Sequence, residues 1–198
     1  GEPPCDGDGR LEDLGWRAVK GPLHKSASGP LPLGAEGGED LVIHVIDEVR
    51  SIRRDFTCKR DMLLNHMKYF ESYLAGLTNE DEVDISVHCD IDVFEWLAEY
   101  MEDERKIEAL DASTVVSILI SSNFLQMAKL VGECLVYISR YINQVVRLPI
   151  DLGCLSDDLV RRLAALFTDD ELHSVRDKRD RIVDRLFAHK VEELLDDD

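Results

Sequence analysis

Residues 56–70, with the sequence FTCKRDMLLNHMKYF, decide the fold class of this chain. From Leu63 to Leu74, apolar side chains recur mostly at steps of three and four residues. This spacing places them on one face of a helix, so we expect a helix, in one piece or two, over residues 61–74. A short strand is expected to end just before it, at residues 56–58.

Short strands and longer helices are predicted on both sides of this stretch. An apolar run at 41–45, flanked by charged residues, predicts a first strand. Alternation of Val83, Ile85 and Val87 with polar residues predicts a half-buried strand. Asp90 or Asp92 is suited to cap the helix that follows. The further helices are expected over 93–101, 115–121 and 127–142, with a break at 123–126.

The residues after Pro149, which cannot continue a helix, predict only further helices. Ser156 is suited to cap the next one. The pattern Thr168-x-x-Glu171 is a capping box, and we expect it to open a longer helix. That helix would carry Leu172, Val175, Ile182, Leu186 and Phe187. Their near-heptad spacing leaves two alternatives, self-pairing or packing onto the domain. The fold class is therefore α+β, with a small sheet and an all-helical C-terminal extension.

The chain is strongly acidic. Its 198 residues include 41 Asp and Glu against 23 Lys and Arg, which gives a formal net charge of −18. Nucleic-acid binding requires a basic face, and no segment of the sequence is basic, so we expect no direct nucleic-acid contact. No apolar run reaches the length of about 18 residues that suggests a transmembrane helix, so no membrane partner is expected. Because residue 1 is Gly rather than Met, we expect a longer parent protein.

Residues 1–39 are rich in glycine and proline. Such a composition is typical of a flexible linker and predicts neither helix nor strand. Within it, Leu11, Leu14, Trp16 and Val19 could form a short amphipathic turn that docks elsewhere.

The five cysteines, Cys5, Cys58, Cys89, Cys134 and Cys154, are an odd number with irregular spacing. This is a poor disulfide framework and fits a reducing compartment, so we expect an intracellular protein of the nucleus, the cytoplasm or both. A zinc site built from Cys58, His66, His88 and Cys89 would match no closed four-ligand spacing. No metal is expected.

The sequence contains no nucleotide-binding or nucleophile motif, so we expect no catalytic residue and no cofactor. Cys58 or Cys89 with His66 or His88 is the nearest approach to a catalytic pair. His88 and Cys89 are adjacent on a strand and therefore point to opposite faces. A small hydrolase or redox protein remains the alternative from another class, and its reactive thiol would alkylate fast.

Three segments resemble the BTB/POZ domain family in the same order. The first is 56–70, with Phe56, the basic pair Lys59-Arg60, Leu63 and Phe70, although Met67 stands where Ser is usual. The second is 93–100 and the third is 115–134. The core of this signature would be Phe56, Leu63, Phe70, Phe94, Leu97, Leu119, Leu125, Leu130 and Cys134.

Within that class, the residues at 42–70, 85–90 and 166–180 resemble the family called SANT and BTB domain regulator of class switch recombination. The resemblance implies a BTB/POZ fold, a small sheet capped by helical hairpins, over 40–142. It implies a helical extension over 143–198, either BACK-like or specific to the family. It also implies a SANT domain outside this sequence.

The resemblance implies a function as well: a non-catalytic interaction domain that homodimerises and recruits partners such as corepressors in nuclear regulation, here as a negative regulator of class switch recombination.

In many BTB domains an acidic residue on the first strand and a basic residue opening the first helix line a charged pocket. The matching residues are Asp40 and Arg60, with Lys59 beside it. An ordinary surface pair is the alternative. A charged, longer stretch before Phe56 suggests a remodelled groove. The alternative function is a substrate adaptor for a cullin-type ubiquitin ligase.

Overall fold

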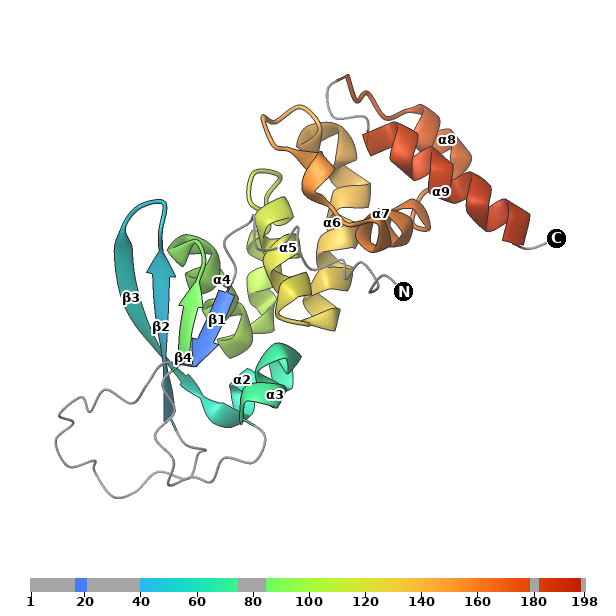
Figure 1. Cartoon of the computed structure of the whole chain (residues 1–198). Helices are drawn as coiled ribbons and strands as arrows, with labels where there is room; N and C mark the ends of the chain where they lie inside the picture. The colour runs from blue at the N-terminus through green and yellow to red at the C-terminus, as the bar shows by residue number, and fades with distance from the viewer. Residues whose placement is uncertain (1–16, 21–39, 75–84, 179–181, 197–198) are drawn as a thin grey trace, which may run out of the picture. The chain divides into compact units, whose positions relative to one another are not determined.

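The computed structural model describes residues 17–20, 40–74, 85–178 and 182–196 (Figure 1). These residues divide into two compact units. The first contains the described residues up to 105 together with 124–127, and the second contains 106–123 and those from 128 onward.

The first unit is built on a four-stranded sheet with the order β1-β4-β2-β3. Its strands are β1 (Arg17–Lys20), β2 (Asp40–Asp47), β3 (Ile52–Lys59) and β4 (Ile85–His88). β2 pairs antiparallel with β3 and parallel with β4, and β4 pairs antiparallel with β1. A tight turn joins β2 to β3, where Ser51 adopts a positive φ of 55°.

One face of this sheet is apolar and covered by a helix. Leu41, Ile43 and Val45 of β2 are buried, as are Ile85 and Val87 of β4, because alternate residues of a strand point to the same face. Helix α4 (Ile91–Glu102) contacts β2 and β3 (Figure 1). The carboxylate of Asp90 begins this helix by accepting hydrogen bonds from the backbone N–H groups of Asp92 and Val93, as predicted.

The stretch quoted first begins at the end of β3, and the residues that follow fold as a helix in pieces, as predicted for 61–74. The pieces are α2 (Arg60–His66), the 3₁₀ turn η1 (Lys68–Phe70) and α3 (Glu71–Leu74). Leu63, Met67 and Phe70 are completely buried. The backbone N–H of Tyr69 donates to the carbonyl of Leu125 at 3.2 Å, which ties these pieces to the short segment 124–127 of the same unit.

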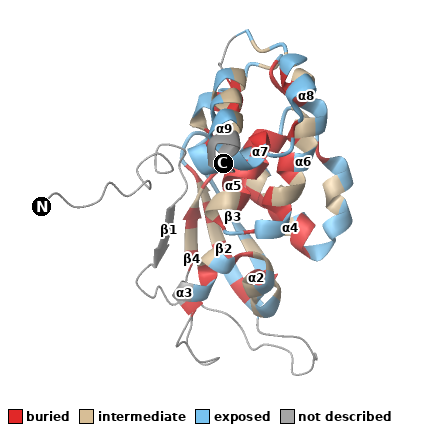
Figure 2. Ribbon diagram, turned by 90° about the vertical axis from the view of Figure 1, so that its right-hand side faces the viewer, coloured by how far each residue is buried: buried red, intermediate tan, exposed pale blue. Residues whose placement is uncertain are grey.

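The second unit is helical. Its elements are η2 (Glu104–Ala109) and α5 (Val115–Phe124), whose outermost residues count with the first unit, then α6 (Ala128–Val145), η3 (Leu152–Cys154), α7 (Asp157–Ala164), α8 (Asp169–His173) and α9 (Ile182–Asp196). Buried residues, red in Figure 2, follow α5, α6 and α7. Together with the sheet of the first unit, these helices confirm the predicted α+β class. Among the described residues, no helix has the length and apolarity needed to cross a bilayer.

The prediction that residues 1–39 contain no strand is wrong at 17–20. This segment forms β1, which pairs with β4 from Arg17 opposite His88 to Lys20 opposite Ile85. An edge strand obtains its backbone hydrogen bonds from a neighbour, so four residues between glycines suffice once β4 is beside them. The rest of the predicted linker, including Leu11, Leu14 and Trp16, lies outside the described residues.

The prediction of one longer helix after Thr168 is also wrong, although its capping box is present. The Thr168 hydroxyl accepts from the backbone N–H of Glu171, whose carboxylate accepts from the Thr168 N–H. Helix α8 nevertheless ends at His173, and α9 begins at Ile182. Asn143 of α6 binds the backbone of the segment between the two helices. Its side chain accepts from the N–H of Arg176 at 2.9 Å and donates to the carbonyl of Ser174 at 3.4 Å.

Candidate interaction site

The residues of the BTB signature form the core rather than a site. Leu63 and the other apolar signature residues from Phe70 to Cys134 have no exposed surface: Phe70, Phe94, Leu97, Leu119, Leu125, Leu130 and Cys134. Phe56 is the exception, because it is half-buried. Its ring lies 4.9 Å from that of Phe94, and the guanidinium of Arg54 lies 5.8 Å from the ring centroid. Phe56 therefore lies at the edge of the core, between Phe94 and the guanidinium of Arg54.

The face of β2 and β3 opposite this core carries mostly polar and charged residues. The paired residues on this outer face are Asp40 with Lys59, Val42 with Thr57, His44 with Asp55, and Ile46 with Arg53. Each pair is at least partly exposed. The charged residues that the sequence places before Phe56 thus extend an ordinary hairpin, and several of them face solvent.

Asp40 and Lys59, two of the residues predicted to line a charged pocket, lie at one end of this outer face. Lys59 Nζ is 2.6 Å from Asp40 Oδ1, with both side chains about half exposed. Arg60 follows directly and opens α2, where Nη2 donates to the carbonyl of Leu74 at 3.2 Å. Strand register therefore brings Asp40 and Lys59 together, while Arg60 fastens the start of α2 to the end of α3.

Two histidines pair with carboxylates in the same unit. His44 Nδ1 lies 2.6 Å from Asp55 Oδ1, and His88 Nδ1 lies 2.8 Å from Glu48 Oε1. The hydrogen bond from His44 lowers the pKa of Asp55 below its ordinary value. These pairs fix the hairpin's charged side chains in place.

Arg50, at the tip of the hairpin, holds three carboxylates. Its guanidinium nitrogens lie 2.6 Å from Asp47, 2.8 Å from Asp90 and 2.8 Å from Asp92. Asp47 is buried, and the backbone N–H and side chain of Arg50 lower its pKa despite the opposing effect of burial. This cluster connects the hairpin to the beginning of α4, so its role is to stabilise the fold.

Three of the described cysteines, Cys58, Cys89 and Cys134, are buried. Burial raises the pKa of the Cys58 thiol to about 11 and that of Cys134 to about 12, and it also raises the pKa of Cys89. Such thiols stay protonated at neutral pH. Within the described residues, no group of three or more His, Cys, Asp or Glu side chains is placed to hold a metal ion.

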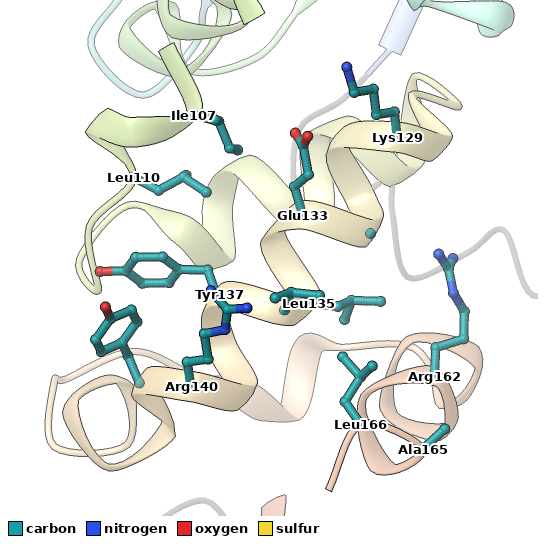
Figure 3. A pocket seen from close by; sticks show the side chains of 13 residues that line it. Ile107, Leu110, Lys129, Glu133, Leu135, Tyr137, Arg140, Arg162, Ala165 and Leu166 are labelled. Carbon is teal, nitrogen blue, oxygen red and sulfur yellow. The ribbon is translucent and has the colours of Figure 1, made fainter. Parts of the chain in front are cut away.

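A second surface feature, in the helical unit, was missed from the sequence. It is a groove of about 760 Å³ beside η2, α6 and α7 (Figure 3). Tyr137 and Tyr141 line it, four residues apart on α6, with ring centroids 4.7 Å apart. This i, i+4 aromatic pair is the signal that could have indicated it, because such residues share a helix face.

A small sheet with a helix packed on one face, followed by further helices, is the arrangement expected of the BTB class of domains. BTB domains are generally non-catalytic and generally mediate homo-oligomerisation and partner binding. Residues 41–135 match the family model described as "SANT and BTB domain regulator of CSR, BTB domain". The match confirms the resemblance over this stretch. No solved structure matches the chain significantly.

Proposed function

We propose that this chain is a non-catalytic homodimerising module that recruits partner proteins in nuclear regulation, with negative regulation of class switch recombination as its setting. The observation that carries this proposal is the family match over residues 41–135. The division into a BTB domain at 40–142 and a helical extension at 143–198 is part of it.

The charged end of the outer face is the proposed dimer groove. Asp40 and Lys59 are about half exposed, and such pairs contribute only about 0–1 kcal/mol to stability. Their loss therefore costs the fold little. Opposite charges near a two-fold axis would meet their counterparts on a second copy and fix its orientation, and Arg60 would add a second cation there.

Co-purification of two differently tagged copies tests this proposal. We expect wild-type copies to co-purify. Lys59→Glu places a carboxylate beside Asp40, so it should weaken co-purification while leaving the thermal unfolding midpoint nearly unchanged. The matched control is Lys178→Glu, an exposed residue of the second unit.

Two results would count against the proposal. Failure of the wild-type copies to co-purify would remove homodimerisation. Co-purification of the Lys59→Glu variant at the wild-type level would remove the role of the charged end while keeping the dimer.

A further inference from the structure

The groove of the helical unit exposes apolar side chains that the fold leaves uncovered. Val136 is 36% exposed, Tyr141 42% and Leu166 44%, and all three line it. The other large apolar side chains with such exposure among the described residues are on the β2–β3 hairpin and α9. Apolar surface gathered in one hollow marks a binding site more strongly than scattered residues do. All of the lining residues belong to the second unit.

The shape of the groove depends on a glycine in the second turn of α6. Gly132 lines the groove, and a Cβ atom placed on it would meet nothing within 4 Å. Glycine is unfavourable inside a helix, and packing within the chain does not require it here. Its small size leaves space directly above the helix backbone, where a partner's side chain can approach. Further along the helix, α6 departs from helical geometry at Tyr141, which also lines the groove, with φ −115° and ψ 21°.

The charges around the groove indicate what it binds. Lys129, Arg140 and Arg162 line it against a single acidic residue, Glu133, in a chain of net charge −18. Figure 3 shows Arg140 on α6 and Arg162 on the opposite border, near Leu166. Arg140 forms no ion pair with any residue that the structure describes, and Arg162 reaches Asp158 only at 3.9 Å. A locally cationic rim on an acidic protein selects acidic ligands.

We infer that this groove binds a short acidic amphipathic segment of a partner protein. Its apolar side chains would enter above Gly132 and against Tyr141 and Leu166, and its carboxylates would pair with Arg140 and Arg162. An amphipathic helix in a hydrophobic groove is a recurrent mode of recognition. This inference rests on the proposal that the chain recruits partners, and it names a surface for that task on the second unit.

The test is fluorescence anisotropy with the full chain and a labelled synthetic peptide of about 15 residues, with leucines at helical spacing and aspartate and glutamate between them. We expect saturable binding with a Kd below about 1 mM that weakens as salt is added. A second peptide has lysine at every acidic position, and a third has alanine at every leucine. Both should bind at least about tenfold more weakly.

Two variants examine the groove itself. Gly132→Gln adds a side chain above α6, where a Cβ atom would meet nothing within 4 Å, and it improves helix propensity. The fold should therefore persist while affinity falls about tenfold or more. Arg140→Glu should cause a similar loss. Their matched controls are Ala188→Gln, on an exposed position of α9, and Arg147→Glu, an exposed arginine outside the groove. Both controls should keep the wild-type affinity.

The chain's own acidic residues at 192–198 are the competing occupant. Replacing them by the matching amides should leave peptide affinity within about twofold. A rise of about tenfold would show that the groove belongs to the chain's own tail and would overturn the inference, as would absent binding or equal binding of the lysine peptide. The mass of the protein particles in the same samples distinguishes the groove inference from the homodimer proposal. A dimer that does not bind the peptide refutes only the groove inference. A monomer that binds the peptide refutes only the homodimer.

Discussion

At the residue scale, the carboxylate of Asp47 couples stability to pH. Its pKa lies below the ordinary value of 3.8, chiefly through the backbone N–H and side chain of Arg50. A carboxylate with a depressed pKa in the folded state stabilises the fold above its unfolded pKa and loses that contribution as pH falls through its folded pKa. The free energy of unfolding should therefore decline below about pH 3.8.

The variant Arg50→Gln removes the side-chain part of this contribution and keeps the backbone N–H of residue 50. It removes the cation from a buried carboxylate, so it should be less stable than wild type at neutral pH and show a flatter decline in acid. Urea unfolding across a pH series measures both effects. Arg53→Gln, which loses only an exposed pair with Asp55 at 3.4 Å, is the control. Equal acid slopes in Arg50→Gln and wild type would contradict this account.

The thiols give a second residue-scale prediction. Burial raises the pKa values of Cys58, Cys89 and Cys134, so in the native chain these residues should react with iodoacetamide far more slowly than after denaturation. Mass spectrometry of the labelled peptides follows each site separately. A native rate equal to that of a free thiol at any of the three would restore the alternative of a cysteine nucleophile.

At this scale the sequence predicts which apolar side chains are buried, but it does not predict the groove. The apolar spacing that places Phe94 and Leu97 on one helix face is a local property, and both are fully buried. The space above Gly132 depends on which side chains from η2 and α7 arrive beside α6. The pair of Asp40 with Lys59 likewise requires the strand register, which follows from the whole hairpin.

At the element scale, caps decide where the helices begin. Ser156 accepts the backbone N–H of Leu159 at 3.3 Å and begins α7, as the sequence predicts. Ser156→Ala should lower the free energy of unfolding by about 1 kcal/mol, whereas Ser156→Asp should retain it, because aspartate caps equally well. Urea unfolding compares the two variants. A loss of stability in Ser156→Asp as large as in Ser156→Ala would refute the capping role.

Elements set by distant contacts were the ones that the sequence did not reveal. The strand β1 exists because β4 supplies its hydrogen bonds. The break between α8 and α9 relies on Asn143, which lies about thirty residues earlier on α6 and bonds to Ser174 and Arg176. The hydrophobic spacing from Leu172 to Phe187 remains helical across the break, so pattern alone predicts one helix.

At the scale of the whole molecule, the family match spans parts of both units. Residues 41–135 cover β2 to α4 in the first unit and extend into α6 in the second. The first unit carries the proposed dimer groove, and the second carries the groove inferred to take an acidic partner. Self-association and recruitment would then use separate surfaces, so that each can be altered alone.

The mass of the chain in solution, measured by light scattering over a series of concentrations, tests the central claim most directly. The account predicts a particle of twice the chain mass of 22.5 kDa that persists on dilution. A mass of one chain at every concentration would contradict it.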